Sequence, residues 1–397
     1  RYVSPSRHVE VQIFGDSAGR VVHFVERECS IQRRHQKIIE EAPSPSLDET
    51  TRSALHQAAV SAGEAIGYTN AGTVEFLLAP PDADGNLEFF FLEVNTRLQV
   101  EHPVTEAVLG VDLVALQLEV AAGGRVPDQA LIGPVNGHAV EARLYAEDPR
   151  ADFQPSTGVV HRFEVTGSVR LDTAIDDRGE VTQFYDPMVA KVIAHGPDRP
   201  SATRTLAASL AAATIDGIST NRELLVRTLR HPEYADRGDS AFLERNDPAQ
   251  LGRSLVDGAD LDAYACAAAL AGQARNRSGD RHTASVSSGF RNVATMPQRV
   301  SLRHSEGESE VRYRFSRGQL DILGVDEREM ASSVVHRVDP MNVDLSIDGV
   351  RQQFETRVDD GRITVSGRLG SISFELLPRF VEPGDQVAAG STIASMP

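Results

Sequence analysis

Two segments that alternate between apolar and polar residues, Thr73–Leu78 and Glu88–Asn95, constrain the fold of this chain most strongly. Such alternation is typical of β-strands that have one buried face. The intervening Pro80–Asn86 is rich in turn-forming residues, so we expect the two strands to form an antiparallel hairpin. The apolar residues expected on the buried face of the second strand are Phe90, Leu92 and Val94.

The opposite face of this hairpin carries two acids and an amide, Glu75 on the first strand and Glu93 and Asn95 on the second. Two carboxylates about 5 Å apart on paired strands repel by roughly 3 kcal/mol at an effective dielectric constant of about 20. A divalent cation removes that repulsion, and oxygen ligands without a nearby histidine or cysteine favour Mg²⁺ or Mn²⁺. The alternative is an ordinary solvated strand face.

The residues that follow the second strand indicate what kind of ligand the site could bind. From residue 93 to residue 103 the chain reads Glu-Val-Asn-Thr-Arg-Leu-Gln-Val-Glu-His-Pro, which places an arginine, a glutamine and another acid before a helix. The planar guanidinium of Arg97 suits a carboxylate-like oxyanion, and Glu101 is a candidate general base beside it. A strand face that meets only solvent requires none of these residues.

Alternating and helical patterns predict the elements around this hairpin. The strand at 8–14 is expected to be half-buried, with His8, Glu10 and Gln12 on its polar face. Ser46 followed by Glu49 forms a capping box, which predicts the start of a helix. The strands expected in this part of the chain are 8–14, 21–25 and 139–145, and the helices are 46–67, 105–122 and 260–274.

Composition excludes several classes of protein. The 397 residues suggest two to three domains, and 41% hydrophobic residues are ordinary for a globular chain. With 40 Lys and Arg against 57 Asp and Glu, the net charge of −17 argues against a nucleic-acid partner. Cys29 and Cys266 form no metal-binding spacing, and no run approaches the ~20 apolar residues of a membrane span. We therefore expect no membrane association and a cytoplasmic location, or the mitochondrial matrix in a eukaryote.

The pattern changes near residue 247. From Arg299 to Leu377 the sequence has about eight short alternating runs, which predict a small antiparallel barrel after the alanine-rich helix. We therefore divide the chain into residues 1–247, residues 248–385 and a final segment, 386–397.

Three ordered motifs carry a resemblance to a known family. They are Arg7–Gln12 (RHVEVQ), Gln32–Lys37 (QRRHQK) followed by Glu40–Pro43 (EEAP), and Glu93–Glu106 (EVNTRLQVEHPVTE). They resemble the biotin carboxylase component of biotin-dependent carboxylases, and the agreement is nearly continuous from Arg7 to about Gly217. The resemblance implies an α+β chain: the C-terminal half of an ATP-grasp fold with the biotin carboxylase C-terminal region, then a helix plus a small antiparallel β-barrel docking domain.

The resemblance also implies a reaction in two halves. ATP and bicarbonate give carboxyphosphate, and its CO₂ passes to N1 of biotin on a carrier domain. Glu101 is then the base, and Arg143 binds biotin and stabilises its enolate. The residues implied to hold Mg²⁺ or Mn²⁺ are Glu75, Glu93 and Asn95, and those implied to hold bicarbonate are Lys37, Arg97, Gln99 and the backbone of Val100. The residues implied to contact ATP are Tyr2, Val3, His8, Gln32, His35, Lys37, Glu75, Leu77 and Glu93.

Several of these residues also have a simpler explanation that involves no function. His8 and His35 are also compatible with ordinary polar-face histidines, and a basic run such as Arg33–Lys37 is usually a solvated patch. The family pattern contains a nucleotide-binding domain and a glycine-rich lid that nothing here matches. We expect both to precede Arg1, and we expect residues 1–397 alone to show no useful ATP turnover, since lid closure excludes water.

The second half of the chain indicates which type of biotin-dependent carboxylase it resembles. Ser287–Asn292 followed by short strands is similar to the domain of acyl-CoA carboxylase α subunits that docks onto the carboxyltransferase β subunit. Leu377–Phe380 and Ser395–Pro397 resemble the approach to a biotinyl domain. We expect a hetero-oligomer of the propionyl-, methylcrotonyl- or acetyl-CoA type, with the carboxyltransferase β subunit and a biotinyl carrier domain as partners. The alternatives are a pyruvate or urea carboxylase, or a non-catalytic scaffold.

Overall fold

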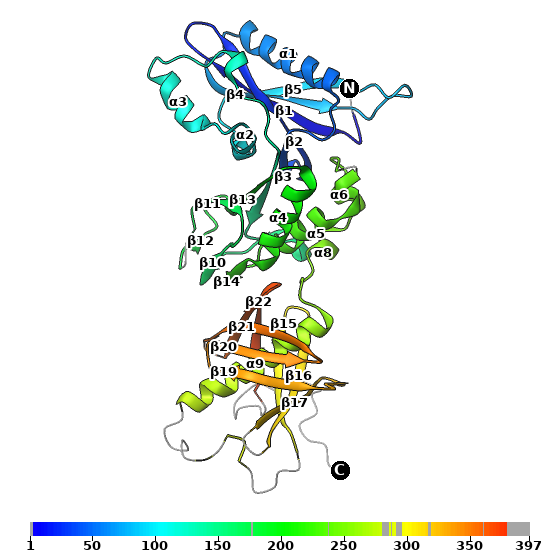
Figure 1. The fold of residues 1–397 in the computed structure, drawn as a ribbon, viewed down its shortest axis with the longest axis vertical. Coiled ribbons are helices and arrows are strands. Elements are labelled where there is room, and N and C mark those ends of the chain that lie inside the picture. Colours follow the sequence, from blue (N-terminus) through cyan, green and yellow to red (C-terminus); the bar gives the residue numbers. More distant parts are fainter. Residues whose placement is uncertain are drawn as a thin grey trace, which may run out of the picture. The chain divides into compact units, whose positions relative to one another are not determined.

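A computed structural model describes residues 3–175, 178–236, 238–279, 286, 288–290, 296–316, 319–359 and 361–378. The chain divides into two compact units, Arg1–Leu255 and Val256–Pro397 (Figure 1). The first unit is built on an eight-stranded sheet and the second on a nine-stranded sheet. None of the helices in the described part combines the length and hydropathy needed to cross a bilayer.

The sheet of the first unit has the order β11-β13-β6-β3-β2-β1-β4-β5, and all neighbours in it are antiparallel. Its strands are β1 (Arg7–Gly15), β2 (Val21–Arg33), β3 (Gln36–Ala42), β4 (Asn70–Leu78), β5 (Phe89–Asn95), β6 (His138–Tyr145), β11 (Val169–Thr173) and β13 (Met188–Gly196). Short paired strands are β7 (Glu147–Asp148) with β8 (Gln154–Pro155), β9 (Gly158–Val159) with β12 (Glu180–Val181), and β10 (Arg162–Glu164) with β14 (Thr214–Asp216). The α-helices are α1 (Glu49–Ala65), α2 (His102–Leu109), α3 (Leu113–Ala121), α4 (Arg199–Ala212), α5 (Arg222–Arg230), α6 (Pro232–Asp236), α7 (Phe242–Arg245) and α8 (Pro248–Leu251).

Helices pack on both faces of this sheet. Helix α1 packs on β1 and β2, where Leu55 and Ala59 meet Val9 and Val11 in one core cluster. Helix α4 packs on β6 and β13, and α2 packs against β2, β3, β6 and β13. The expectation of a half-buried first strand is wrong, because Glu10 on its polar face is also fully buried.

Both predicted helix boundaries in this region need correction. The first helix begins after Asp48, whose carboxylate accepts a hydrogen bond from Thr51 N at 2.7 Å, so the capping box at Ser46 is wrong. The helix predicted over 105–122 is two helices, α2 and α3. Gly110 ends the first with a φ of 68°, which favours glycine, and Asp112 caps the second.

The predicted hairpin is confirmed as β4 and β5, with Glu75 opposite Glu93. The pairing then slips by one residue, so that Phe76 lies opposite Phe91 and Leu92 is the extra residue of a β-bulge. The predicted buried face of Phe90, Leu92 and Val94 is therefore wrong in two of its three residues. Leu92 is 45% exposed, and Phe90 lies opposite Leu77, which lines a cleft on the other face. Val94 packs against the core.

The second unit contains α9 (Gly258–Gly279) and an antiparallel sheet of order β18-β17-β16-β15-β23-β22-β21-β20-β19. Its strands are β15 (Gln298–His304), β16 (Gly307–Ser316), β17 (Gln319–Val325), β18 (Arg328–Glu329), β19 (Ser333–Val338), β20 (Asn342–Ile347), β21 (Val350–Asp359), β22 (Arg362–Gly367) and β23 (Gly370–Leu376). The sheet curls around α9, because β17 also contacts β19 and the helix touches β15, β16, β17 and β19 to β23. The predicted helix and small antiparallel barrel are confirmed in the form of a helix and a curled antiparallel half-barrel. The C-terminal motifs at Phe380 and Ser395–Pro397 lie outside the described residues, as do Ser287, Arg291 and Asn292.

Candidate active site

A cleft of about 930 Å³ opens in the first unit, at the polar side of the β4–β5 hairpin. The predicted site residues that line it are Val3, His8, Gln32, His35, Lys37, Glu75, Leu77, Glu93, Asn95, Arg97, Gln99, Val100 and Arg143. Glu101 does not line the cleft, because it is fully buried behind the lining, and Tyr2 lies outside the described residues. Residues from six strands and the loop after β5 thus meet in one cavity.

Strand pairing explains how the acids come together. Glu93 lies opposite Glu75, Glu75 opposite Glu10, and Glu10 opposite Arg27, so four charged residues form one row across β5, β4, β1 and β2. Directly opposite side chains in antiparallel strands lie about 5 Å apart, so three adjacent acids need cations nearby.

Lys37 supplies the central cation. Its Nζ lies 2.5 Å from Glu10 Oε2, 2.6 Å from Glu101 Oε1 and 3.0 Å from Glu75 Oε1. Burial alone would lower the pKa of Lys37, but the surrounding acids, led by Glu10, raise it above its ordinary value. The ammonium is therefore charged at neutral pH and faces the cleft.

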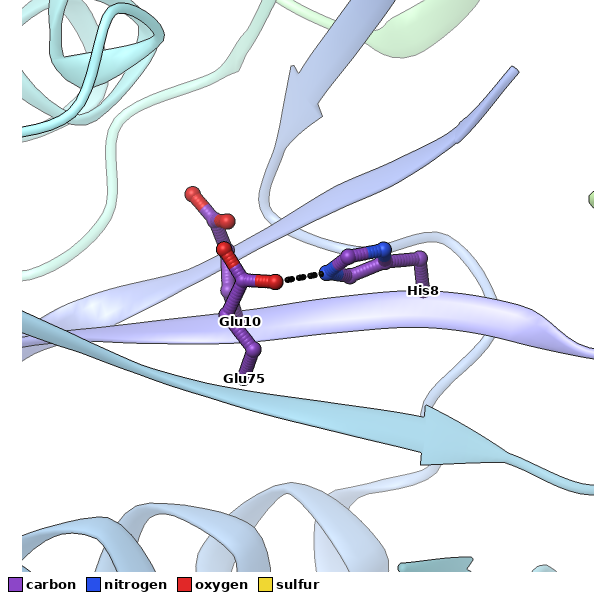
Figure 2. A group of neighbouring side chains, drawn as sticks. All are labelled: His8, Glu10 and Glu75. Carbon is purple, nitrogen blue, oxygen red and sulfur yellow. Dashed lines mark ion pairs between the residues drawn. The ribbon is translucent and has the colours of Figure 1, made fainter. Parts of the chain in front are cut away.

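Glu75 is ionised because positively charged and hydrogen-bonding groups surround its carboxylate. Figure 2 shows His8 and Glu75 joined by an ion pair beside Glu10, and His8 Nε2 lies 2.6 Å from Glu75 Oε2. Burial would raise the pKa of Glu75, but His8 and Lys37 outweigh it and hold the pKa at about 2. Gln99 Nε2 donates a further hydrogen bond to Glu75 Oε1 at 2.8 Å.

The hairpin acids and Asn95 form a set of donors that fits a divalent cation. Asn95 Nδ2 lies 3.1 Å from Glu75 Oε1 and 2.9 Å from Glu93 Oε1, so one small group bridges the two carboxylates. Glu93 is exposed to the cleft. Two carboxylates and an amide offer the hard oxygen ligands that Mg²⁺ and Mn²⁺ prefer.

Arg143 and Glu101 form the deeper part of the site. Arg143 donates from Nη2 to Glu101 Oε2 at 2.9 Å and from Nε to Glu40 Oε1 at 2.5 Å. Burial would lower the pKa of Arg143, but Glu40 and Glu101 raise it. Arg97, in contrast, is exposed and donates to the Leu98 carbonyl at 3.2 Å, which leaves its guanidinium open to the cleft.

The far end of the cleft holds the residues predicted to meet the nucleoside. Gln32 Nε2 lies 2.9 Å from His8 Nδ1 and donates to the Cys29 carbonyl at 2.6 Å. His35 sits in the turn between β2 and β3 with a φ of 70°. Leu77 and Val3 add apolar lining there.

Three residues that support this site, namely Glu10, Arg27 and Lys191, were not identified from the sequence. Arg27 is fully buried and donates from Nε to Glu10 Oε1 at 2.6 Å, and Lys191 donates to the Val100 carbonyl at 2.9 Å. Glu10 had a signal, since it alternates with His8 on the polar face of β1. Arg27 and Lys191 had none, because only tertiary contacts give them partners.

Comparison with protein families gives three consecutive matches. Residues 1–129 match the carbamoyl-phosphate synthase L chain ATP-binding domain, and residues 141–245 match the biotin carboxylase C-terminal domain. Residues 260–379 match the BT domain of the methylcrotonyl-CoA carboxylase alpha subunit.

Curated relatives agree with these matches. The chain is 48% identical over 238 residues to the mitochondrial methylcrotonoyl-CoA carboxylase subunit alpha of Arabidopsis thaliana, covering 59% of this chain and 32% of that protein. It is 35% identical over 411 residues to the Mus musculus subunit, covering 100% of this chain and 57% of that one. A biotin carboxylase of Halalkalibacterium halodurans is 47% identical, over 64% of this chain and 55% of the relative. The chain thus spans between a third and just over half of these relatives.

Solved structures resemble the first unit. The biotin carboxylase domain of Hydrogenobacter thermophilus 2-oxoglutarate carboxylase, in complex with MgADP, ADP and bicarbonate, has a TM-score of 0.59 and 38% identity, over 64% of this chain and 55% of that one. A Campylobacter jejuni biotin carboxylase in complex with β,γ-ATP has a TM-score of 0.58 and 40% identity, over 62% and 54%.

The matched domains, together with the antiparallel sheet and the paired acids of the cleft, identify the first unit as part of an ATP-grasp ligase. The chain belongs to the biotin carboxylase family, and its succession of matched domains is that of methylcrotonyl-CoA carboxylase alpha subunits.

Proposed function

We propose that the full-length protein carboxylates biotin with bicarbonate in an ATP-dependent reaction, with carboxyphosphate as the intermediate. We further propose that it is the α subunit of an acyl-CoA carboxylase of the methylcrotonyl-CoA type. The observation that carries the reaction is the convergence of Lys37, Arg97 and Arg143 with the acids Glu75 and Glu93 in one cleft. The BT domain match over residues 260–379 supports the subunit type.

Bicarbonate binds between the Arg97 guanidinium, the Gln99 amide and the backbone of Val100. Glu101 takes the proton from its hydroxyl, and the resulting oxygen attacks the γ-phosphorus of ATP while ADP leaves. Lys37 and Arg143 hold the two oxygens of Glu101, at 2.6 Å and 2.9 Å, so the base is fixed before substrate arrives. Lys37 also places a positive charge beside the phosphate oxygens, while its ammonium is held by Glu10, Glu75 and Glu101.

Glu75, Glu93 and Asn95 would hold Mg²⁺ or Mn²⁺. When bound, the ion neutralises charge on the phosphate oxygens of ATP. Arg143 acts in the second half of the reaction, where its guanidinium stabilises the enolate oxygen of biotin as N1 loses its proton. His8, Gln32, His35 and Leu77 contact the nucleoside end of ATP.

The test is biotin-dependent ATP hydrolysis and incorporation of labelled bicarbonate by the full-length protein. Arg97→Ala is expected to lower both rates at least about 100-fold, in line with the loss of one oxyanion-binding group. Arg204→Ala, an exposed arginine on α4, is the matched control and stays within about two-fold. Equal rates in the wild type and Arg97→Ala would favour the scaffold alternative.

The partners follow from the same proposal. The second unit docks onto a carboxyltransferase β subunit, a biotinyl carrier domain delivers biotin to Arg143, and the assembly is a hetero-oligomer in the cytoplasm or mitochondrial matrix. Co-purification with the β subunit, followed by assays with methylcrotonyl-, propionyl- and acetyl-CoA, tests the substrate type. Carboxylation of pyruvate or urea instead would overturn the acyl-CoA assignment.

A further inference from the structure

A pair of fully buried acids lies beside the candidate active site, on neighbouring strands. Glu40 on β3 is directly opposite Glu141 on β6, and both side chains are 0% exposed. Opposite residues in antiparallel strands lie about 5 Å apart at their Cβ atoms, which brings the two carboxyl groups into reach of each other.

Among the described residues, one of the four oxygens of this pair has a hydrogen-bond donor. Glu40 Oε1 accepts from Arg143 Nε at 2.5 Å. Glu40 Oε2 and both oxygens of Glu141 are buried and have no hydrogen-bond partner among the described residues. Two ionised carboxylates with three unpartnered oxygens would be strongly unfavourable away from water.

The surroundings offer little compensation. Ala42, Val104, Val108, Ala139 and Ile193 form an apolar cluster on this face, and Ile193 is the β13 neighbour of Glu141. The charged and titratable groups near the pair are Cys29 on β2, Lys37 on β3, Arg143 and Tyr145 on β6, Lys191 on β13 and Glu101 before α2.

Of the nearby cations, Lys37 and Lys191 are bonded to other groups, whereas Arg143 is bonded to Glu40. Lys37 binds three acids, Lys191 binds the Val100 carbonyl at 2.9 Å, and Arg143 binds Glu40 and Glu101. Burial raises the pKa of both carboxyl groups above the ordinary value, and the charge of Glu40 raises the pKa of Glu141 further.

We propose that Glu40 and Glu141 hold one proton between them, carried on Glu141, and that ionised Glu40 thereby fixes Arg143 against Glu101. The proton turns Glu141 from an unpartnered acceptor into a donor toward Glu40 Oε2. It also leaves one negative charge on the pair, which matches the single Arg143 guanidinium. Glu40 and Glu141 are then positioning residues, and the part of this inference that concerns catalysis rests on the proposed function of Arg143 and Glu101.

Infrared spectroscopy tests the shared proton without relying on activity. In the full-length wild type near neutral pH, a protonated carboxyl C=O band is expected that is absent from Glu141→Gln. Glu26→Gln is the control, because Glu26 is equally buried but is paired with His56 at 2.7 Å and with Arg52 at 3.0 Å, and should contribute no such band. An identical carboxyl region in the wild type and Glu141→Gln would overturn the proposal.

The wild type alone gives a second test if a variant does not fold. Raising the pH should remove the same band as the shared proton is lost, while circular dichroism shows the fold intact. A band that never appears at any pH at which the protein is folded would overturn the shared proton, whatever the protein's activity.

Kinetics test the positioning role. Glu40→Gln removes the charge that holds Arg143, so the kcat for biotin-dependent ATP hydrolysis should fall at least ten-fold with the KM for ATP within two-fold. Glu141→Gln cannot lose a proton and should abolish any fall in kcat that the wild type shows on the alkaline side. The reverse pattern, a large loss in Glu141→Gln and none in Glu40→Gln, would overturn the assignment of the proton to Glu141.

Discussion

Lys37 and Glu101 form a largely buried ion pair in which Nζ lies 2.6 Å from Oε1, although the residues are 64 positions apart in the sequence. The same ammonium reaches Glu10 and Glu75, so one cation on β3 compensates three acids from separate elements. Stability and catalysis are therefore coupled at Lys37, because the group that would contact phosphate also neutralises the interior of the sheet.

Replacing Lys37 by methionine should destabilise the protein. The change leaves Glu10, Glu75 and Glu101 without their shared cation, and breaking one partner of a buried ion pair typically costs about 3–5 kcal/mol. Urea denaturation measures the free energy of unfolding. Arg34→Gln is the control, since the Arg34–Asp152 pair is 69% and 77% exposed and should change stability by less than about 1 kcal/mol. A Lys37→Met protein as stable as the control would contradict the compensation argument.

Glu26 gives a prediction on acid stability outside the cleft. Burial would raise its pKa, but hydrogen bonds and charge from His56 and Arg52 hold the pKa at about 2, below the ordinary value of 4.5. A lowered carboxyl pKa contributes stability that is complete above about pH 4.5 and is lost as the pH falls toward 2.

Glu26→Gln should therefore be less stable than the wild type at neutral pH, by up to about 3 kcal/mol, and should lose less stability between pH 5 and pH 2. Chemical denaturation at a series of pH values measures both effects. Asp48→Asn is a comparison at an exposed carboxyl, which accepts a capping hydrogen bond from Thr51 N. Parallel curves for the wild type and Glu26→Gln would rule out this linkage.

The hairpin could be predicted from the sequence because the residues that determine it are close together in the chain. Alternation over Thr73–Leu78 and Glu88–Asn95 sets which side chains share a face, and the short turn between them makes the pairing antiparallel. The position of Glu75 opposite Glu93 follows from that pairing. The bulge at Leu92 does not, because a one-residue slip leaves the apolar pattern of a phenylalanine-rich strand unchanged.

The burial of the polar face could not be predicted, because its partners come from distant segments. Glu10 and Gln12 look solvated in the sequence, yet Arg27 on the next strand binds both, at 2.6 Å and 3.0 Å. The break between α2 and α3, in contrast, could have been predicted from neighbouring residues. Gly110 and Asp112 are an ordinary helix stop and start, but the continuous apolar pattern around them favoured one long helix.

Glu93 should control the metal requirement with little effect on stability. It is exposed and accepts from Asn95 at 2.9 Å, so Glu93→Gln removes a proposed cation ligand without uncovering a buried charge. The Mg²⁺ or Mn²⁺ concentration for half-maximal ATP hydrolysis should rise at least about ten-fold, in line with the loss of one ligand interaction. Glu88→Gln, at the other end of the hairpin segment, serves as the control. An unchanged metal requirement in Glu93→Gln would exclude this residue as a ligand.

Lys191 should affect bicarbonate more than ATP. Its Nζ donates to the Val100 carbonyl at 2.9 Å and lies 3.3 Å from Asp172. Lys191 therefore fixes the position of the Val100 backbone, which is proposed to bind bicarbonate. Lys191→Met removes that anchor, and a displacement of about 1 Å at a binding group can cost up to about 100-fold in rate. The KM for bicarbonate should rise about ten-fold or more, while the KM for ATP stays within about two-fold.

A second variant separates this anchoring from a general loss of charge near the cleft. Asp172→Asn keeps Lys191 charged but removes the acid that holds it from β11, so the KM for bicarbonate should rise less than in Lys191→Met. Equal rises in the KM for ATP and for bicarbonate would mean that Lys191 supports the whole cleft. In that case the link from Lys191 to the backbone of Val100 would have no special part in binding the anion.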